Sequence, residues 1–147
     1  MMGNLLVKRA VSRELARIGI DRAVQESIDT DCLVCIAVLD GDGQLVSYDR
    51  MDGAPFQSAQ LAQDKAYSVA GNGVAGHDFW DMIKDQPWLV SGVQKVTGLV
   101  FLGGGVPIRY QGELIGAIGV SGQSNMDQDR SIAEVAVAAI LDALDAN

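Results

Sequence analysis

The stretch of residues 98–122 constrains the fold more than any other part of the chain. It reads GLVFLGGGVPIRYQGELIGAIGVSG, with short apolar runs on both sides of Gln111-Gly112. Glycine adopts the left-handed backbone angles that a two-residue hairpin turn needs, so Gln111-Gly112 is expected to reverse the chain. The sequence therefore predicts a β-hairpin whose return strand covers residues 113–120.

Two glycines in the return strand indicate a close approach to its backbone. Gly116 and Gly119 would weaken a strand unless a packed helix or a ligand has to come near, and helix packing is the commoner of the two reasons. Simple alternation of side chains predicts two faces. The first holds Leu114, Gly116, Ile118 and Val120, and the second holds Ile115, Ala117, Gly119 and Ser121.

The rest of the chain alternates between helical and strand patterns. We expect helices over 4–30 (split or bent at Gly19), 56–70, 78–84 and 127–144, and further strands over 32–39 and 44–48. A stripe of small side chains in the 56–70 helix, Ala59, Ala62, Ala66 and Val69, suits close packing on the glycine-marked hairpin. Hairpins separated by helices predict an α+β fold with an antiparallel sheet.

Composition restricts the class of protein. A chain of 147 residues is expected to form one domain, covering residues 1–147, and its net charge of −8 argues against nucleic acid or an anionic membrane as partner. The N-terminus lacks the pattern of a signal peptide, and no apolar run is long enough to span a bilayer. Two cysteines without such a signal predict a cytoplasmic protein with free thiols.

Two short motifs are expected to be accidental. Residues 71–76 match GxGxxG, but they follow a predicted helix instead of a strand, so they do not predict a dinucleotide site. Cys32 and Cys35 form a CxxC on a predicted strand, where residues three apart point to opposite faces and cannot hold one metal ion. We interpret both cysteines as buried structural residues.

His77 is the single histidine and the strongest candidate functional residue. It lies between a glycine-rich loop and a predicted helix, next to Phe79 and Trp80, with Trp88 further along. Such a neighbourhood is typical of an apolar pocket with one proton carrier or one iron ligand, although a lone histidine is often only a surface side chain. Lys65, by contrast, is expected to lie on an ordinary solvated face of its helix.

Four segments together give the chain a family resemblance. They are AVLDGDGQLVSYDRMDGAP (37–55), AQDKAYSVA (62–70), GGGVPIRYQGELIGAIGVSG (103–122) and QDRSIAEVAVAAI (128–140). In this order and spacing they resemble the GlcG/HbpS family, which includes the C-terminal domain of PduO-type proteins. The resemblance implies a profilin-like three-layer α/β/α fold with a roughly five-stranded antiparallel sheet, and a homo-oligomer. The fifth strand would lie within 86–97 or elsewhere.

The resemblance also implies a small-ligand-binding protein, with haem or a related tetrapyrrole as the ligand. Members often place a threonine before a histidine where this chain has Gly76-His77, so His77 is the expected ligand of the haem iron. The predicted ligand-binding residues are His77, Arg50, Phe79, Trp80, Trp88, Gly104, Gly105 and Ser121.

Two other functions stay open. The chain could be a cofactor-independent enzyme, an isomerase, hydratase or lyase, acting on a small organic acid or carbonyl compound. His77 would then be the acid or base, Lys65 or Arg50 would bind a carboxylate in the same pocket, and Asp127 would orient. Alternatively, it could be a non-catalytic oligomeric partner protein, with an apolar interface around 79–90 and no pocket.

Overall fold

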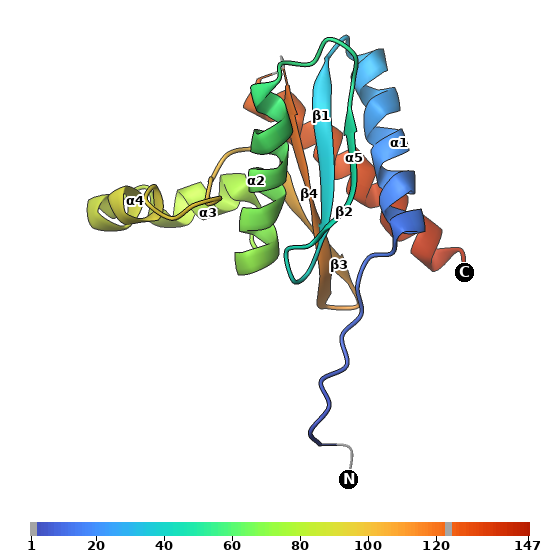
Figure 1. The fold of residues 1–147 in the computed structure, drawn as a ribbon, viewed down its shortest axis with the longest axis horizontal. Coiled ribbons are helices and arrows are strands. Elements are labelled where there is room, and N and C mark those ends of the chain that lie inside the picture. Colours follow the sequence, from blue (N-terminus) through green and yellow to red (C-terminus); the bar gives the residue numbers. More distant parts are fainter. Residues whose placement is uncertain (1–2, 123–124) are drawn as a thin grey trace.

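The computed structural model describes residues 3–122 and 125–147 and has an α+β architecture, as predicted. One sheet has helices on both faces (Figure 1). The helices are α1 (Arg13–Asp29), α2 (Gln57–Asn72), α3 (Gly76–Ile83), α4 (Pro87–Val93) and α5 (Met126–Asp145). The strands are β1 (Val34–Asp40), β2 (Leu45–Arg50), β3 (Gly105–Tyr110) and β4 (Glu113–Gly122).

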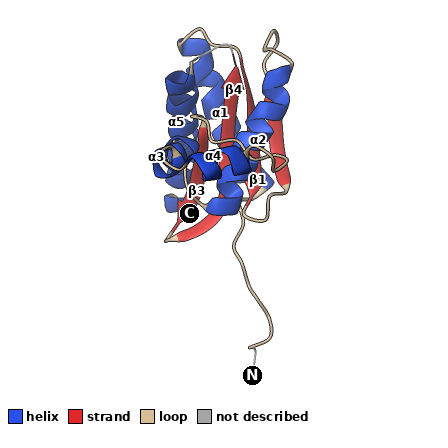
Figure 2. Ribbon diagram, turned by 90° about the vertical axis from the view of Figure 1, so that its left-hand side faces the viewer, coloured by secondary structure: helices blue, strands red, loops and turns tan. Residues whose placement is uncertain are grey.

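The sheet separates two layers of helices. Its four strands are all antiparallel and run in the order β2-β1-β4-β3. Figures 1 and 2 show α2 on one side of the sheet and α1 with α5 on the other. Isoleucines and valines dominate the core under α1 and α5, whereas alanines dominate the core under α2. The small residues let α2 lie closer to the sheet.

The hairpin forms as predicted, with one irregularity. Gln111 and Gly112 have φ angles of 51° and 80°, as a tight turn between antiparallel strands requires. The register shifts between Ile108 and Arg109, so β4 carries one extra residue at Ile115. Ile115 therefore packs in the core under α1 and α5, and the predicted alternation is wrong at this position.

The close approach predicted at the glycines is confirmed. A Cβ at Gly119 would overlap the carbonyl oxygen of Ala62 and lie 2.8 Å from the amide nitrogen of Ala66, both in α2. On the opposite face, a Cβ at Gly116 would lie 2.8 Å from Val11. Gly119 is thus the contact that seats α2 on the sheet.

The first predicted helix is too long by about half. Residues 5–11 do not form a helix, and α1 begins where the Ser12 hydroxyl accepts a hydrogen bond from the Leu15 amide. The physical reason is the hairpin: Arg9 binds the Glu113 carboxylate through its backbone and side chain, and the Val11 amide donates to Ile115. From there on α1 is continuous, because Gly19 is the point where Ile140 of α5 packs against it.

The fifth strand implied by the resemblance is absent from the described residues. The 86–97 segment, proposed to hold it, contains α4 instead. Pro87 stands in the first turn of that helix, where its fixed φ favours a helix and its missing N–H costs nothing. The α3–α4 pair projects sideways beyond α2 (Figure 1), and α4 contributes no buried residue.

The two motifs expected to be accidental behave as expected. The sheet is antiparallel, so residues 71–76, which join α2 to α3, belong to no βαβ unit. Cys32 and Cys35 are buried, free, and packed in different cores. No cluster of ligands that could hold a metal ion occurs among the residues in 3–122 and 125–147.

Candidate functional site

A cavity of about 610 Å³ lies between the α3–α4 pair, the segment before β3 and the first turn of α5. Its walls are mostly apolar. Ile83, Val90, Val93, Leu99, Val100, Phe101, Leu102, Gly103 and Met126 make up the apolar part, with Trp80. The polar lining residues are His77, Asp81, Gln94, Asp127 and Arg130. This combination is typical of a site for a small molecule.

Glycines bring the three walls together. A Cβ at Gly76, the first residue of α3, would overlap the Leu102 carbonyl oxygen. A Cβ at Gly103 would lie 2.9 Å from the carbonyl oxygen of Met126 at the start of α5. The segment before β3 is also tied to α2, because the Val100 amide donates to the Ser68 hydroxyl at 2.8 Å. Small residues at 76 and 103 therefore define the edges of the cavity.

The imidazole of His77 is the polar group with the least satisfied surroundings. Its Nε2 lies 3.4 Å from a carboxylate oxygen of Asp78, which is largely exposed. Its Nδ1 is buried and has no hydrogen-bond partner among the described residues. A neutral imidazole with its proton on Nε2 faces Asp78 and leaves the Nδ1 lone pair open. Such a nitrogen can bind a metal ion or accept a proton.

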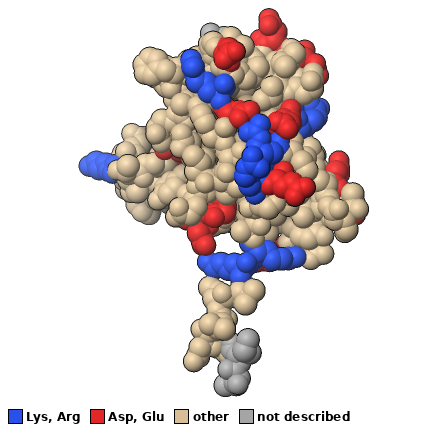
Figure 3. Space-filling view, turned by 45° about the vertical axis from the view of Figure 1, so that its right-hand side comes forward, with Lys and Arg blue, Asp and Glu red and all other residues tan. Residues whose placement is uncertain are grey.

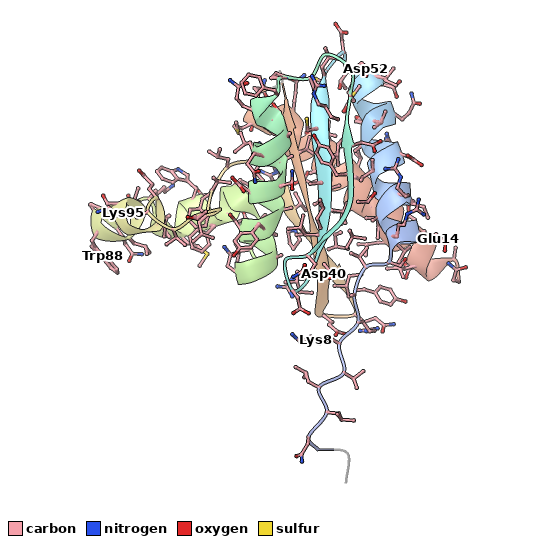
Figure 4. All side chains as sticks on the ribbon, in the orientation of Figure 1. Lys8, Glu14, Asp40, Asp52, Trp88 and Lys95 are labelled. Carbon is pink, nitrogen blue, oxygen red and sulfur yellow. The ribbon has the colours of Figure 1, made fainter. Side chains whose placement is uncertain are left out.

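The aromatic side chains divide between the cavity and the exposed surface. Trp80 lines the cavity. Phe79 does not, but its ring stacks on that of the cavity residue Phe101, with centroids 4.0 Å apart. Trp88 does not line the cavity: it is 73% exposed and lies at the start of α4, on the projecting pair of helices (Figure 4). Of the three predicted aromatic residues, Trp80 lines the cavity, and Phe79 and Trp88 do not.

Lys65 is not on a solvated face, and that interpretation is wrong. Its side chain is fully buried under β4, where Nζ lies 3.0 Å from a carboxylate oxygen of Asp129 and donates to the carbonyl of Val120 at 2.9 Å. Burial lowers the pKa of Lys65, and Asp129 opposes that shift by stabilising the charged form. Gly104 borders this ion pair, Gly105 packs against the Lys65 carbonyl and Val69 of α2, and neither glycine lines the cavity.

Two further predicted site residues also lie elsewhere. Arg50 donates two hydrogen bonds to the Ala54 carbonyl and lines a separate hollow with Val24 and Asp52. Figure 4 shows Asp52 at one end of the sheet, far from the projecting α3–α4 pair that carries Trp88. Ser121 is buried in β4 opposite Cys35. The enzyme hypothesis requires Lys65 or Arg50 to share a cavity with His77. Neither residue lines that cavity.

Sequence reasoning missed the cation that does line the cavity. Arg130 follows Asp127 by one turn of α5, so both reach the same wall. Its guanidinium forms an ion pair with Glu134 at 2.7 Å, and this hydrogen bond raises the pKa of Arg130. The only signal was the spacing of residues 127 and 130 on one helix. The cavity also contradicts the expectation, made for a partner protein, that no pocket is present.

The fold and the cavity define a class of small α+β protein with a ligand-sized hollow beside its sheet. The chain belongs to the family described as "Haem degrading protein HbpS-like", whose sequence model matches residues 11–138. The predicted family is thereby confirmed.

Similar proteins support this assignment. The chain is 32% identical over 128 residues to the corrinoid adenosyltransferase PduO of Salmonella typhimurium; the match covers 86% of this chain but only 37% of PduO. The crystal structure of a Streptomyces reticuli HbpS double mutant superposes with a TM-score of 0.84 at 27% identity, covering 92% and 90% of the two chains. A PduOC–haem complex gives 0.78 at 31% identity, covering 88% and 94%.

Charged side chains of both signs are mixed on the face of the molecule that Figure 3 shows. This mixing is in keeping with surface ion pairs such as Arg17–Asp49 and Lys8–Asp42. None of the helices in the described part of the chain is long and apolar enough to cross a membrane.

Proposed function

We propose that this protein binds haem, or a related tetrapyrrole, in the cavity beside α3. The observation that carries the proposal is the buried Nδ1 of His77, which has no hydrogen-bond partner among the described residues and belongs to a residue that lines a mostly apolar cavity. An apolar wall with one open nitrogen ligand is what a haem iron and its macrocycle require. The relative PduOC, solved as a haem complex, supports the same ligand class.

The residues of the cavity fit haem. His77 would hold the iron, and Trp80 with Phe101, braced by Phe79, would pack on the macrocycle. Arg130 is the cation available for a propionate, although Glu134 already occupies one edge of its guanidinium. Haem, once bound, would supply an iron centre for ligand or redox chemistry. The chain's own contribution is binding, orientation and exclusion of water.

The test is a haemin titration followed at the Soret band, with three proteins. Wild type is expected to bind saturably near one equivalent, and His77→Ala is expected to lose the ligand-field features of a nitrogen-bound iron. Phe56→Ser is the matched control, because Phe56 is exposed and lies outside the cavity, and it should titrate like wild type. Binding that is unchanged in His77→Ala would move the iron ligand elsewhere. No saturable Soret change in wild type would refute the haem proposal.

We also infer that the protein is a homo-oligomer in a reducing compartment such as the cytoplasm. The seven-residue α4 buries no residue of its own chain, and a helix this short gains little stability alone. Trp80, Met82 and Trp88 are exposed on the same projecting pair of helices. The two buried thiols are free. Sedimentation velocity should show an oligomer, and Trp88→Asp should shift it toward a monomer; a monomeric wild type would contradict the inference.

A second function, turnover of a small acid or carbonyl compound, is favoured by one observation. His77, Asp127 and Arg130 line the same cavity. They could serve as the acid or base, the orienting carboxylate and the cation that binds the substrate. Lys65 and Arg50 have no place in that arrangement. Screening small carboxylic acids and carbonyl compounds for turnover that His77→Ala removes, and that added haemin does not require, distinguishes this function from haem binding.

A further inference from the structure

Lys65 is a second polar group at the cavity, hidden behind its wall. Its Nζ is fully buried and has three contacts from two elements: the Val120 carbonyl of β4 at 2.9 Å, and the Asp129 carboxylate at 3.0 Å and Met126 sulfur at 3.8 Å of α5. Nothing in the proposed binding of haem uses it. Burying an ammonium group costs desolvation free energy, so the specific contacts of Lys65 call for an explanation.

The three donors of this ammonium are unequally satisfied. A lysine ammonium has three N–H groups, and two of them meet strong oxygen acceptors. Among the described residues, the partner left for the third is a thioether sulfur, a weak acceptor, at 3.8 Å. A buried N–H with such a partner forgoes most of the free energy of a hydrogen bond. An oxygen atom in place of the sulfur would be the better partner.

Among the residues in 3–122 and 125–147, Met126 both contacts this donor and lines the cavity. The Met126 side chain lines the cavity and is 42% exposed, and methionine has three rotatable bonds. On its other side the ammonium is enclosed by backbone: Gly104, with φ of 112°, approaches so closely that a Cβ there would lie 3.1 Å from Nζ and 2.9 Å from Asp129. The ammonium therefore stays in place while Met126 can turn aside.

We propose that Lys65 is a concealed hydrogen-bond donor of the cavity, which binds a neutral carbonyl oxygen of an apolar ligand when Met126 rotates away. A carboxylate is the poorer match, because Asp129 already balances the charge of Lys65 and would repel a second anion. Asp127, on the same wall as Met126, adds to that repulsion. A ketone, aldehyde, ester or amide oxygen meets no such penalty.

This inference rests on the proposed use of the cavity as a small-molecule site, but not on haem. The experiment compares two probes of nearly equal shape, 2-octanone and 2-methyl-1-octene, in which a CH₂ group replaces the carbonyl oxygen. Calorimetric titration of wild type should show the ketone binding about tenfold more tightly, the effect of one hydrogen bond from a charged donor. Met126→Ala should widen that ratio, because no side chain has to be displaced.

An infrared measurement supplies a readout that a structural role would not move. The C=O stretch of bound 2-octanone should shift to lower frequency than in hexane, and the shift should vanish in the double variant Lys65→Met/Asp129→Leu, which removes both charges together. Arg130→Gln is the matched control for the other cation of the cavity and should keep both the preference and the shift. If the double variant does not fold, the Met126→Ala ratio and the wild-type infrared shift decide.

The possible failures are distinguishable. Equal binding of the two probes would refute the role of Lys65 and leave the cavity as a ligand site. Binding of neither probe would overturn both this inference and the proposed small-molecule function. Loss of the preference in Arg130→Gln would assign the carbonyl to Arg130 and refute the assignment to Lys65.

Discussion

Two polar groups lie on either side of the first turn of α5, in opposite surroundings. On the inner side, Lys65 and Asp129 form an enclosed ion pair against backbone from β4 and the glycines before β3. On the outer side, His77 lines the cavity, and its Nδ1 is buried without a hydrogen-bond partner among the described residues. The fold depends on the enclosed pair, whereas a ligand can gain from the open nitrogen.

The difference follows from what each group would lose on exposure or on mutation. A paired buried charge contributes little net stability over an apolar pair, but removing one partner leaves the other charge stranded. An open imidazole nitrogen costs the folded protein a missing hydrogen bond, which a bound ligand restores. The enclosed site is therefore expected to be sensitive to single substitutions in stability, and the open site in binding.

The largest expected effect comes from breaking the enclosed pair. Lys65→Met leaves Asp129 without its cation in the core, which should lower the free energy of unfolding by about 3–5 kcal/mol. Equilibrium urea unfolding measures the loss. The control is Lys84→Met, which removes an exposed lysine whose ion pair with Asp81 contributes little, so the change should stay within about 0.5 kcal/mol.

The double variant sharpens this prediction. Lys65→Met/Asp129→Leu removes both charges and should recover much of the stability that Lys65→Met loses, because no buried charge stays unpaired. A double variant no more stable than Lys65→Met would show that the loss comes from packing around the lysine stem and not from the stranded carboxylate.

A smaller effect is expected where the sheet and α2 meet. Gly119→Ala would force a methyl group against the backbone of Ala62 and Ala66, and overpacking of this kind should cost about 1–3 kcal/mol. Gly92→Ala in the projecting α4 is the control, since nothing lies within 4 Å of its added Cβ. Alanine favours a helix over glycine, so this variant should gain about 0.5–1 kcal/mol. Similar thermal shifts for the two variants would contradict the assigned packing.

The sequence predicts the local features of this comparison better than the distant ones. The hairpin turn, the alanine stripe of α2 and the close approach at Gly119 are each written in neighbouring residues, and all three are confirmed. The segment before α1 was wrongly expected to be helical, because the hydrogen bonds from Arg9 that hold it reach across more than 100 positions of the sequence.

The site shows the same limit more clearly. Lys65 stands among Gln63, Asp64 and other polar residues, so its surroundings in the sequence indicate a solvated face. Its partner Asp129 is 64 positions away, and only the tertiary fold makes the burial possible. Arg130 was overlooked for a related reason, since the cavity forms where α3, α4 and α5 meet. The place of His77 beside an apolar cavity was predictable, because its aromatic neighbours are adjacent in the sequence.

The smallest expected effect concerns the clamp that holds the extended N-terminal segment. The Arg9 amide and guanidinium lower the pKa of the Glu113 carboxyl below its usual range of about 4.3. A carboxyl with a lowered folded-state pKa stabilises the fold above its unfolded-state pKa, and this contribution disappears as the pH falls through the folded-state value. The stability difference between wild type and Glu113→Gln should therefore be present at neutral pH and shrink below about pH 4.

Thermal unfolding of both proteins between pH 3 and pH 7 measures this difference, with 1 M salt as the control, because added ions screen an exposed ion pair. The clamp and the Lys65–Asp129 pair should then respond differently to salt. The stability contributed by the exposed Arg9–Glu113 pair should fall. The stability lost in Lys65→Met should not change, since solvent ions do not reach the buried pair. A salt-insensitive clamp, or a difference that grows toward acid pH, would mean that Glu113 acts through packing and not through its charge.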